Sequence, residues 1–244
     1  MAEFEQGVPE WDYAARLTEV QARIHTTEFT TGRAGSNVKL LVATKAWDAD
    51  AAVAAVNAGA TLVGESRMQE LAAKGALLKS AGARVHVIGQ LQRNKAATAV
   101  EFADCIQTVD SLALAERLSR LCAEAGKSLD VMIQVNVSGE ESKAGVDPGE
   151  ALKLASAAQS LPFLTVTGFM TIGLNSPDEG AVRAGYARLA ELRDEALIRS
   201  ERGEIDLREA WELSMGMSND LEWAIAEGAT IVRVGTAVMG HRSR

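Results

Sequence analysis

Cysteine and basic residues are both scarce in this chain, and each scarcity argues against a class of protein. Only Cys105 and Cys122 occur in 244 residues, without a CxxC pair or histidines at metal-ligand spacing. A disulfide framework and a zinc site are therefore not indicated, and we expect both thiols to be buried in a reducing compartment. Lys and Arg number 25 against 33 Asp and Glu, a formal charge of −8. This sign argues against nucleic acid as a partner.

Long apolar runs are missing as well. No run approaches the roughly 20 residues that cross a membrane, and the opening MAEFEQGVPEW lacks the basic and apolar regions of a secretory signal. We therefore expect a cytoplasmic protein without a membrane partner. No stretch rich in Pro, Gly or Ser divides the chain, so we predict one domain over residues 1–244.

The spacing of apolar residues predicts an α/β fold. Tyr13, Leu17, Val20 and Ile24 recur at helical spacing, which indicates an amphipathic helix over 10–28, and a connecting loop is expected over Thr26–Asn37. Beyond it, β-branched apolar runs alternate with Ala-rich helical patterns. The predicted strands are Val38–Thr44, Thr61–Gly64, Arg84–Gly89, Cys105–Val109, Asp130–Asn136, Thr165–Ile172, Trp211–Ser214 and Thr230–Val234; the predicted helices are 48–58, 66–80, 93–102, 111–125, 148–160, 178–202 and 218–227.

Eight such strands, several apolar on both faces, indicate a parallel sheet covered by helices. We predict a single (β/α)8 TIM barrel with an extra N-terminal helix, in which residues 1–37 form that helix and its connecting loop. A doubly wound open sheet is the alternative. It should carry a GxGxxG turn after its first strand, where this chain has VATKAWD instead.

Lys45 directly follows the apolar run Leu40–Thr44, at the strand end where barrel enzymes place their chemistry. We expect it to be partly desolvated there, which would lower its amine pKa and favour attack on a carbonyl. The alternative is a lysine whose stem packs on the barrel while its amine reaches solvent.

A second group of candidates follows the last two predicted strands. In barrels, phosphate sites form from these two loops, where backbone N–H groups and hydroxyls meet the anion. The alternative is that 218–220 is an ordinary helix N-cap and Gly235 an ordinary turn. The small and hydroxyl-bearing candidates are Ser214, Gly216, Ser218, Gly235 and Thr236.

A reactive lysine opposite a phosphate cradle suits an aldehyde that carries a phosphate, and pyridoxal 5'-phosphate (PLP) is such a molecule. Arg233 is expected to point along the last strand toward the bound ring; its alternative is a surface ion pair at the barrel rim. His86 lies within an apolar strand, and we expect a hydrogen-bonded core or rim residue rather than a catalyst.

Several motifs, in order over roughly residues 38–242, resemble the pyridoxal phosphate homeostasis proteins (the YggS/PROSC family). They are Val42-Ala43-Thr44-Lys45, Gly64-Glu65, His86-Val87-Ile88-Gly89 with Leu91-Gln92 and Asn94-Lys95, Gln134-Val135-Asn136 with Ser142-Lys143-Ala144-Gly145, Gly168-Phe169-Met170-Thr171-Ile172, Ser214-Met215-Gly216-Met217-Ser218 and Arg233-Val234-Gly235-Thr236. Two positions depart from the family pattern: Ser66-Arg67 replaces its usual Asn-Tyr, and Met239 replaces a common aromatic residue.

The resemblance implies a barrel like that of alanine racemase without that enzyme's second domain. Carried over by position, Lys45 is the Schiff-base lysine and Arg233 faces the pyridine nitrogen. Ser214, Met217, Ser218, Gly235 and Thr236 fall in the phosphate-binding segments. The implied function is to carry or buffer PLP, as a monomer serving PLP-dependent apoenzymes and vitamin B6 and amino-acid homeostasis, without substantial turnover.

Two enzymatic hypotheses stand beside this one. A PLP-dependent racemase of the alanine racemase class needs a second acid/base, a tyrosine from another domain in the known racemases, whereas Tyr13 and Tyr186 both lie in predicted helices. A Schiff-base aldolase of the barrel class places its lysine on a later strand than the first.

Overall fold

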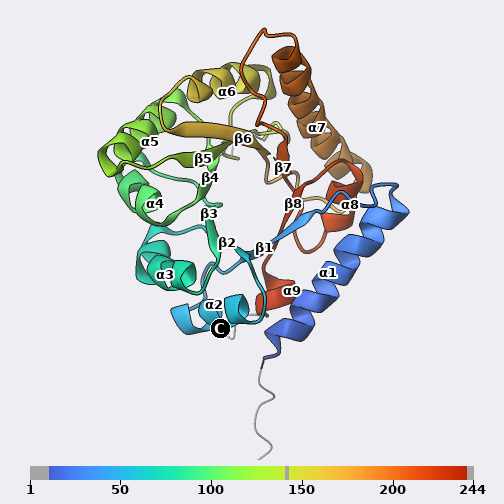
Figure 1. Cartoon of the computed structure of the whole chain (residues 1–244). Coiled ribbons are helices and arrows are strands. Elements are labelled where there is room, and N and C mark those ends of the chain that lie inside the picture. The colour runs from blue at the N-terminus through green and yellow to red at the C-terminus, as the bar shows by residue number, and fades with distance from the viewer. Residues whose placement is uncertain (1–10, 141–142, 241–244) are drawn as a thin grey trace, which may run out of the picture.

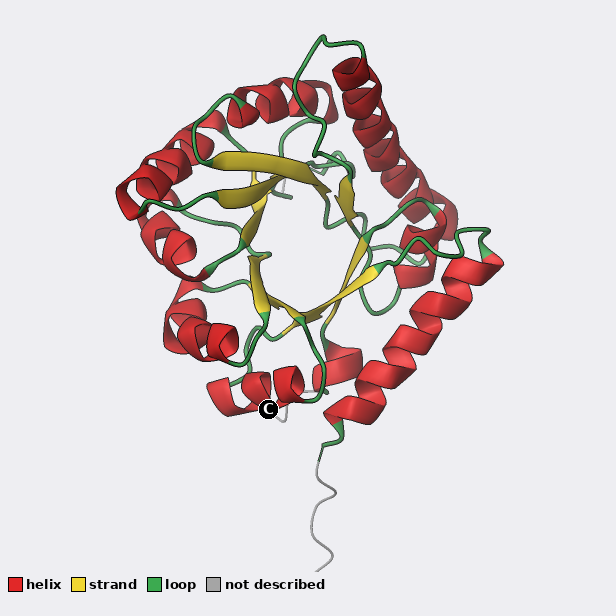
Figure 2. Cartoon of the chain, in the orientation of Figure 1, coloured by secondary structure: helices red, strands yellow, loops and turns green. Residues whose placement is uncertain are grey.

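A computed structural model describes residues 11–140 and 143–240, and they form a closed barrel of eight parallel strands (Figures 1 and 2). Each strand pairs with the next, and the last pairs with the first. The strands are β1 (Lys39–Ala43), β2 (Leu62–Glu65), β3 (Arg84–Val87), β4 (Cys105–Val109), β5 (Leu129–Gln134), β6 (Leu164–Met170), β7 (Glu212–Ser214) and β8 (Ile231–Val234).

Helices surround this barrel (Figure 2), since each parallel crossover returns the chain over the outside of the sheet. The helices are α1 (Tyr13–Thr30), α2 (Ala49–Asn57), α3 (Met68–Ser80), α4 (Ala96–Phe102), α5 (Leu112–Ala125), α6 (Ala151–Gln159), α7 (Glu179–Glu201), α8 (Leu221–Ala226) and α9 (Thr236–Met239), with 3-10 turns η1 (Arg93–Lys95) and η2 (Pro148–Glu150). Among the described residues, no helix is both long and apolar enough to span a membrane.

The predicted barrel is confirmed, and the doubly wound alternative is wrong because β8 closes onto β1. Every predicted strand overlaps an observed one. The short α9 was not expected, because four residues show no helical periodicity. Met239, at its end, is buried.

The predicted N-terminal helix is present, and it lies against α8 and α9 outside the barrel (Figure 1). Leu17, Val20 and Ile24 form its buried face, as their spacing indicates. The loop expected from Thr26 begins later, because the helix continues to Thr30. Glu28 is buried at this end and accepts a hydrogen bond from the Val38 amide at 2.8 Å, which ties the connection to the start of β1.

The barrel interior has an apolar floor below a polar layer. Leu41, Leu62, Cys105, Met132, Met170 and Ile231 form a cluster inside the strands that is separate from the outer core. Gln107, Ser214 and Arg233 lie further toward the C-terminal ends of their strands and are also buried. Both cysteines are buried and free, as predicted.

A buried ion pair fixes the end of β1, where Lys45 follows. Lys74 of α3 lies 2.8 Å from the Glu65 carboxylate, and both side chains are almost fully buried. The Lys74 amine also donates to the carbonyls of Thr44 and Trp47, at 2.8 and 2.9 Å, while the Thr44 hydroxyl donates to Glu65. The backbone on both sides of Lys45 is therefore held by one buried cation.

We predict that Lys74→Ala lowers the free energy of unfolding by about 3 to 5 kcal/mol, because it leaves the Glu65 carboxylate buried without a cation. Chemical denaturation at neutral pH measures this loss. The matched control is Lys79→Ala on the same helix, whose half-exposed pair with Asp104 at 2.9 Å should contribute below about 1 kcal/mol.

The defect of Lys74→Ala should shrink in acid. Burial raises the pKa of Glu65, so the folded state takes up a proton at a higher pH than the unfolded chain does. The cost of this buried carboxylate is therefore lost as the pH falls through the folded pKa toward the unfolded value of about 4.3. Removal of Lys74 raises that pKa further. If both variants lose equal stability, or if the Lys74→Ala defect grows in acid, the ion pair does not hold this loop.

Candidate functional site

A cavity of about 840 Å³ opens at the C-terminal ends of the strands. The segments after β1, β6, β7 and β8 contribute to its wall, together with α1. Of the seven residues predicted for the site, the structure brings six to this one cavity: Lys45, Met217, Ser218, Arg233, Gly235 and Thr236. The seventh, Ser214, lies elsewhere.

Lys45 lies in the turn after β1 and is exposed, so the expected desolvation of this side chain is wrong. The backbone beside it is strained. Ala46 has a left-handed φ of 70°, unusual for a residue with a Cβ, and its amide donates to Glu70 Oε2 at 2.6 Å. Such strain persists where the surrounding structure holds it, and it is concentrated at functional sites.

Arg233 is buried, with 6% of its surface exposed. Its Nη1 donates to the Ser214 hydroxyl at 2.9 Å and its Nη2 to the Thr171 carbonyl at 2.7 Å. Burial lowers the pKa of Arg233 to about 10, which leaves the side chain charged at neutral pH. The alternative of a surface ion pair is wrong: among the described residues, no carboxylate lies within 4.0 Å of it.

Ser214 is fully buried beneath Arg233 and does not line the cavity. Its hydroxyl accepts from Arg233 and lies 2.7 Å from Gln107 Oε1. These contacts make it a positioning residue for the guanidinium. A direct contact between Ser214 and a phosphate stays a prediction.

The loop between β7 and α8 turns sharply at Gly216, whose φ is 85° and whose missing Cβ would collide with Ala224. Asp220 holds this loop: Oδ1 accepts from the Met217 amide at 2.6 Å and Oδ2 from the Tyr186 hydroxyl at 2.8 Å. Asp220 occupies the N-cap position of α8 but caps no amide of that helix. The ordinary N-cap interpretation therefore does not explain this side chain.

Backbone N–H groups without acceptors indicate an anion-binding site at the loops that follow β7 and β8. Within the described chain, the amides of Ser218, Asn219, Thr236 and Ala237 donate to no protein acceptor. All four residues line the cavity, along with the hydroxyls of Ser218 and Thr236. Arg23 of α1 fixes the first loop from outside, donating to the Ser218 carbonyl at 3.2 Å and to Glu222 at 2.8 Å.

The cavity is basic in a chain that is acidic overall. Arg16, Arg23, Lys45, Lys143 and Arg233 line it, against the single carboxylate of Asp220 among the described lining residues. Arg16, Arg23 and Lys143 are each paired with a glutamate. Lys45 and Arg233 form no ion pair with any described residue, so they are the two lining cations without a carboxylate partner.

Sequence analysis missed residues that position this site. Lys74 and Gln107 are buried, and the one available signal was a polar side chain within an otherwise apolar pattern. Lys143, whose role the family motif left open, donates to the Gly173 carbonyl at 2.8 Å at the cavity wall. Ser142 of the same motif lies outside the described residues, as do Glu141 and His241. His86 is buried and hydrogen-bonded, as predicted, and does not line this cavity.

Comparison with known proteins places the chain in a family. The family described as "Alanine racemase, N-terminal domain" matches residues 19–243. The chain is 37% identical to the pyridoxal phosphate homeostasis protein of Vibrio cholerae, over 93% of this chain and 94% of that one. It is 39% identical to the protein of the same name from Pseudomonas aeruginosa, over 94% and 95%.

Solved structures agree. PipY of Synechococcus elongatus, determined with PLP bound, superposes with a TM-score of 0.79 at 34% identity, covering 93% of this chain and 100% of PipY. Alanine racemase of Clostridium difficile shares the fold alone, with a TM-score of 0.70 at 16% identity, and this chain covers 98% of its own length but 61% of that enzyme. The chain belongs to the pyridoxal phosphate homeostasis protein family, within the broader family of the alanine racemase N-terminal domain.

Proposed function

We propose that this protein binds PLP through Lys45 and carries or buffers it. The observation that carries the proposal is the pair of lining cations without carboxylates, Lys45 and Arg233, which share one cavity with four free backbone amides. PLP offers an aldehyde, a pyridine nitrogen and a phosphate. An amine, a buried guanidinium and an amide cradle are the groups that would bind these three parts.

The relatives support this assignment. PipY has been determined with PLP bound, and the Vibrio cholerae and Pseudomonas aeruginosa proteins are named for PLP homeostasis. Six of the residues that line the cavity fall in the motifs that carry the family resemblance: Lys45, Met217, Ser218, Arg233, Gly235 and Thr236.

Each residue has a distinct role in the proposal. Lys45 would form the covalent attachment, and its exposure gives it access to an incoming aldehyde. The hydroxyls of Ser218 and Thr236 would donate hydrogen bonds to the phosphate, while Gly235 and Met217 would complete the loops around it. Arg233 would donate to the ring nitrogen, and Ser214 holds Arg233 in place.

Arg233 also limits the chemistry of the site. Bound PLP supplies an electron sink, which is strongest when its ring nitrogen is protonated. A guanidinium can only donate hydrogen bonds, so Arg233 favours an unprotonated nitrogen. The residues of this chain would therefore hold the cofactor in a weakly activating state.

The racemase alternative needs a second acid/base near Lys45, and the tyrosines offer none. Tyr186 is buried, and its hydroxyl donates to Asp220. Burial is the main cause that raises the pKa of Tyr186, and the negative charge of Asp220 is the second. A phenol with a raised pKa is a poor base at neutral pH. Tyr13 lies on α1, and burial also raises its pKa. We therefore favour a carrier over a racemase. We further propose that this carrier is a cytoplasmic monomer that supplies apoenzymes.

Borohydride reduction of the PLP-treated protein should fix a pyridoxyl group on Lys45, since this is the exposed amine in the cavity without an ion-pair partner. Peptide mass mapping locates the label, and Lys45→Ala should abolish it. Lys153→Ala, a change to an exposed lysine on α6, serves as the control and should label normally. A label found chiefly on Lys95 or Lys143 would show that the attachment site is misassigned.

The amide cradle should make PLP bind far better than pyridoxal, because free donors aimed at an anion gain nothing from a ligand without one. Ser218→Ala should weaken PLP binding by about 1 kcal/mol, the scale of one hydrogen bond. Equilibrium titration monitored by absorbance measures both. Ser156→Ala on α6, outside the cavity, is the matched control. Equal affinities for PLP and pyridoxal would remove the cradle from the proposal.

The PLP-loaded protein should exchange the α-proton of alanine or serine in deuterated buffer only at trace rates, because neither tyrosine is suited to act as the second acid/base and Arg233 weakens the sink. Proton NMR follows the exchange over time. Turnover in the ordinary enzymatic range of about 1 to 1000 per second would favour the racemase instead.

A further inference from the structure

A second hollow, of about 520 Å³, lies outside the strands where η1 and α5 meet. Arg93 and Asn94 of η1 line it, together with Ala113, Arg117 and Arg120 of α5. The three α5 residues recur at spacings of four and three, so they share one face of that helix. We call this feature the arginine hollow. None of the residues proposed for PLP lines it.

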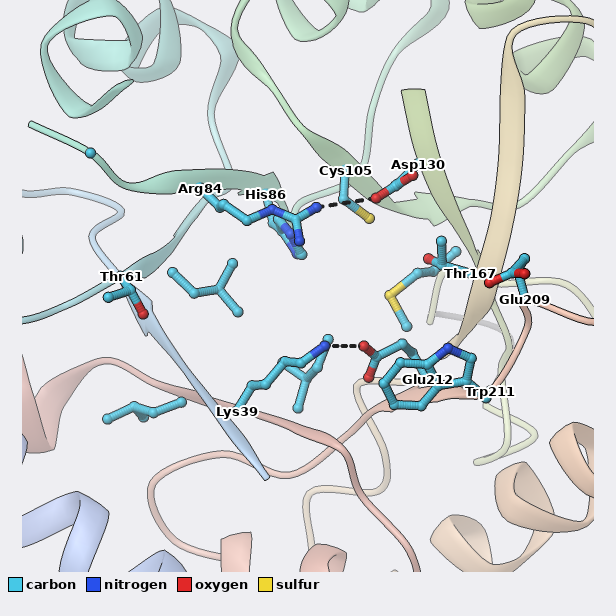
Figure 3. Close-up of a pocket in the computed structure, with 15 residues that line it drawn as sticks. Lys39, Thr61, Arg84, His86, Cys105, Asp130, Thr167, Glu209, Trp211 and Glu212 are labelled. Carbon is cyan, nitrogen blue, oxygen red and sulfur yellow. Dashed lines mark hydrogen bonds and ion pairs between the residues drawn. The ribbon is translucent and has the colours of Figure 1, made fainter. Parts of the chain in front are cut away.

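The three guanidiniums of the arginine hollow have no partner within residues 11–140 and 143–240. Arg93, Arg117 and Arg120 form no ion pair there and donate no side-chain hydrogen bond. Every other described arginine does one or the other. Most pair with a carboxylate, as Arg84 does with Asp130 at 3.1 Å (Figure 3), and the remaining two donate to backbone carbonyls. The unpartnered arginines of the described chain are therefore gathered in one place.

The charge of the arginine hollow is not balanced locally. Among the described residues, no carboxylate lines it. Glu116 and Glu124 lie on α5 four residues before and after Arg120, at the spacing of helical ion pairs, yet neither is within 4.0 Å of its guanidinium. Arg117 and Arg120 are neighbours of like charge on one helix face, which disfavours the helix without a ligand. A positive cluster of this kind in a chain of formal charge −8 needs an explanation beyond solvation.

The lining residues indicate what kind of anion would fit. A guanidinium presents a planar fork that matches phosphate oxygens in pairs, and clusters of arginines recognise phosphate groups in many proteins. A phosphate monoester carries up to about two negative charges, so three cations match more than one phosphate. Ala113 is the single apolar residue among the described lining residues, and a hydrophobic body would gain little there.

We propose that the arginine hollow binds two adjacent phosphate groups, either as pyrophosphate or as the phosphates of a nucleoside diphosphate. Arg117 and Arg120 hold the phosphates from α5, and Arg93 closes on them from η1. The Asn94 amide donates to a further oxygen. This site is separate from the PLP cavity and does not depend on the proposed function.

Titration with pyrophosphate in metal-free buffer tests the proposal, and NMR of the nitrogen-15-labelled protein locates the binding. The backbone amide signals of Asn94, Ala113 and Arg117 should shift together with one Kd. Orthophosphate, which carries less charge, should bind more weakly. Pyrophosphate that entered the amide cradle would instead shift the signals of Ser218 and Thr236, so the two sites are distinguished in one spectrum.

Single substitutions assign the binding to the guanidiniums. Arg120→Gln and Arg117→Gln should each raise the Kd for pyrophosphate about threefold, the scale of one exposed charge interaction. Arg120→Lys keeps the charge but loses the fork, so its Kd should lie between that of Arg120→Gln and that of the unchanged protein. Arg208→Gln is the matched control, because Arg208 is exposed and paired with Asp206 at 3.3 Å. It changes the net charge equally and should leave the Kd unchanged.

ADP distinguishes the two sources of the phosphates. A Kd for ADP similar to that for pyrophosphate would assign recognition to the phosphates of either molecule, and a much weaker one would leave pyrophosphate as the ligand. Four results would overturn the proposal: no shift of the α5 and η1 signals, an unchanged Kd in both Arg→Gln variants, an equal loss in Arg208→Gln, or binding of ADP without binding of pyrophosphate. Hexaglutamate that bound as tightly as pyrophosphate would also overturn it, in favour of an acidic protein segment. Failure of PLP to bind would leave these titrations interpretable, because they report on α5 and η1.

Discussion

A guanidinium buried inside the barrel is the constraint on which the rest of the interior depends. Removing a cation from water is costly unless hydrogen bonds replace its hydration. Arg233 has no carboxylate partner among the described residues and relies on the Thr171 carbonyl and the Ser214 hydroxyl. Because it only donates, the Ser214 oxygen accepts from it, and the Ser214 hydroxyl in turn donates to Gln107 Oε1. Ser214, Gln107 and His86 follow in a single sense across the barrel.

The two ends of the barrel differ in which polar groups lack a partner. At the C-terminal end, the exposed Lys45 and the buried Arg233 line one cavity, and no described carboxylate pairs with either charge. At the N-terminal end, ion pairs neutralise Arg84 and Lys39, and the buried His86 Nε2 has no hydrogen-bond partner among the described residues. The inner apolar cluster packs within the same barrel as these hydrogen-bonded side chains. The low local dielectric there strengthens each of their hydrogen bonds.

Much of the fold and part of the site were predictable from sequence because both follow from strand position. Apolar β-branched runs between Ala-rich helices located all eight strands. Residues just beyond the strand ends, Lys45 and Ser218 among them, line the expected cavity. Ser214 did not, because it is the last residue of β7 and faces inward. Position along the chain does not distinguish the cavity from the interior beneath it.

Residues that act through tertiary contacts gave little signal. Lys74 lies on an amphipathic helix, where a lysine normally marks the solvent face, yet it is buried against Glu65 and two carbonyls. The helix was predicted to end at residue 28 and the connecting loop to begin at Thr26, but α1 continues to Thr30. Threonines lose side-chain freedom in a helix, yet Thr27, Thr30 and Thr31 each donate to a carbonyl of the preceding turn. In both places local propensity was overridden by a specific hydrogen bond.

Exposure of Lys45 favours the proposed carrier over an enzyme on physical grounds. An enzyme gains rate by enclosing its reacting atoms, because exclusion of water strengthens the electrostatic interactions that stabilise a transition state. A carrier must let its covalent bond to the cofactor be reached by water or by another amine, or the cofactor stays bound. Lys45 stands on a turn held rigidly from below by Lys74 and Glu70 but is itself open to the cavity mouth. A fixed backbone with an accessible amine suits reversible attachment better than sequestered chemistry. In the proposed binding mode, Arg233 would weaken the electron sink and so protect the attached cofactor from side reactions with amino acids.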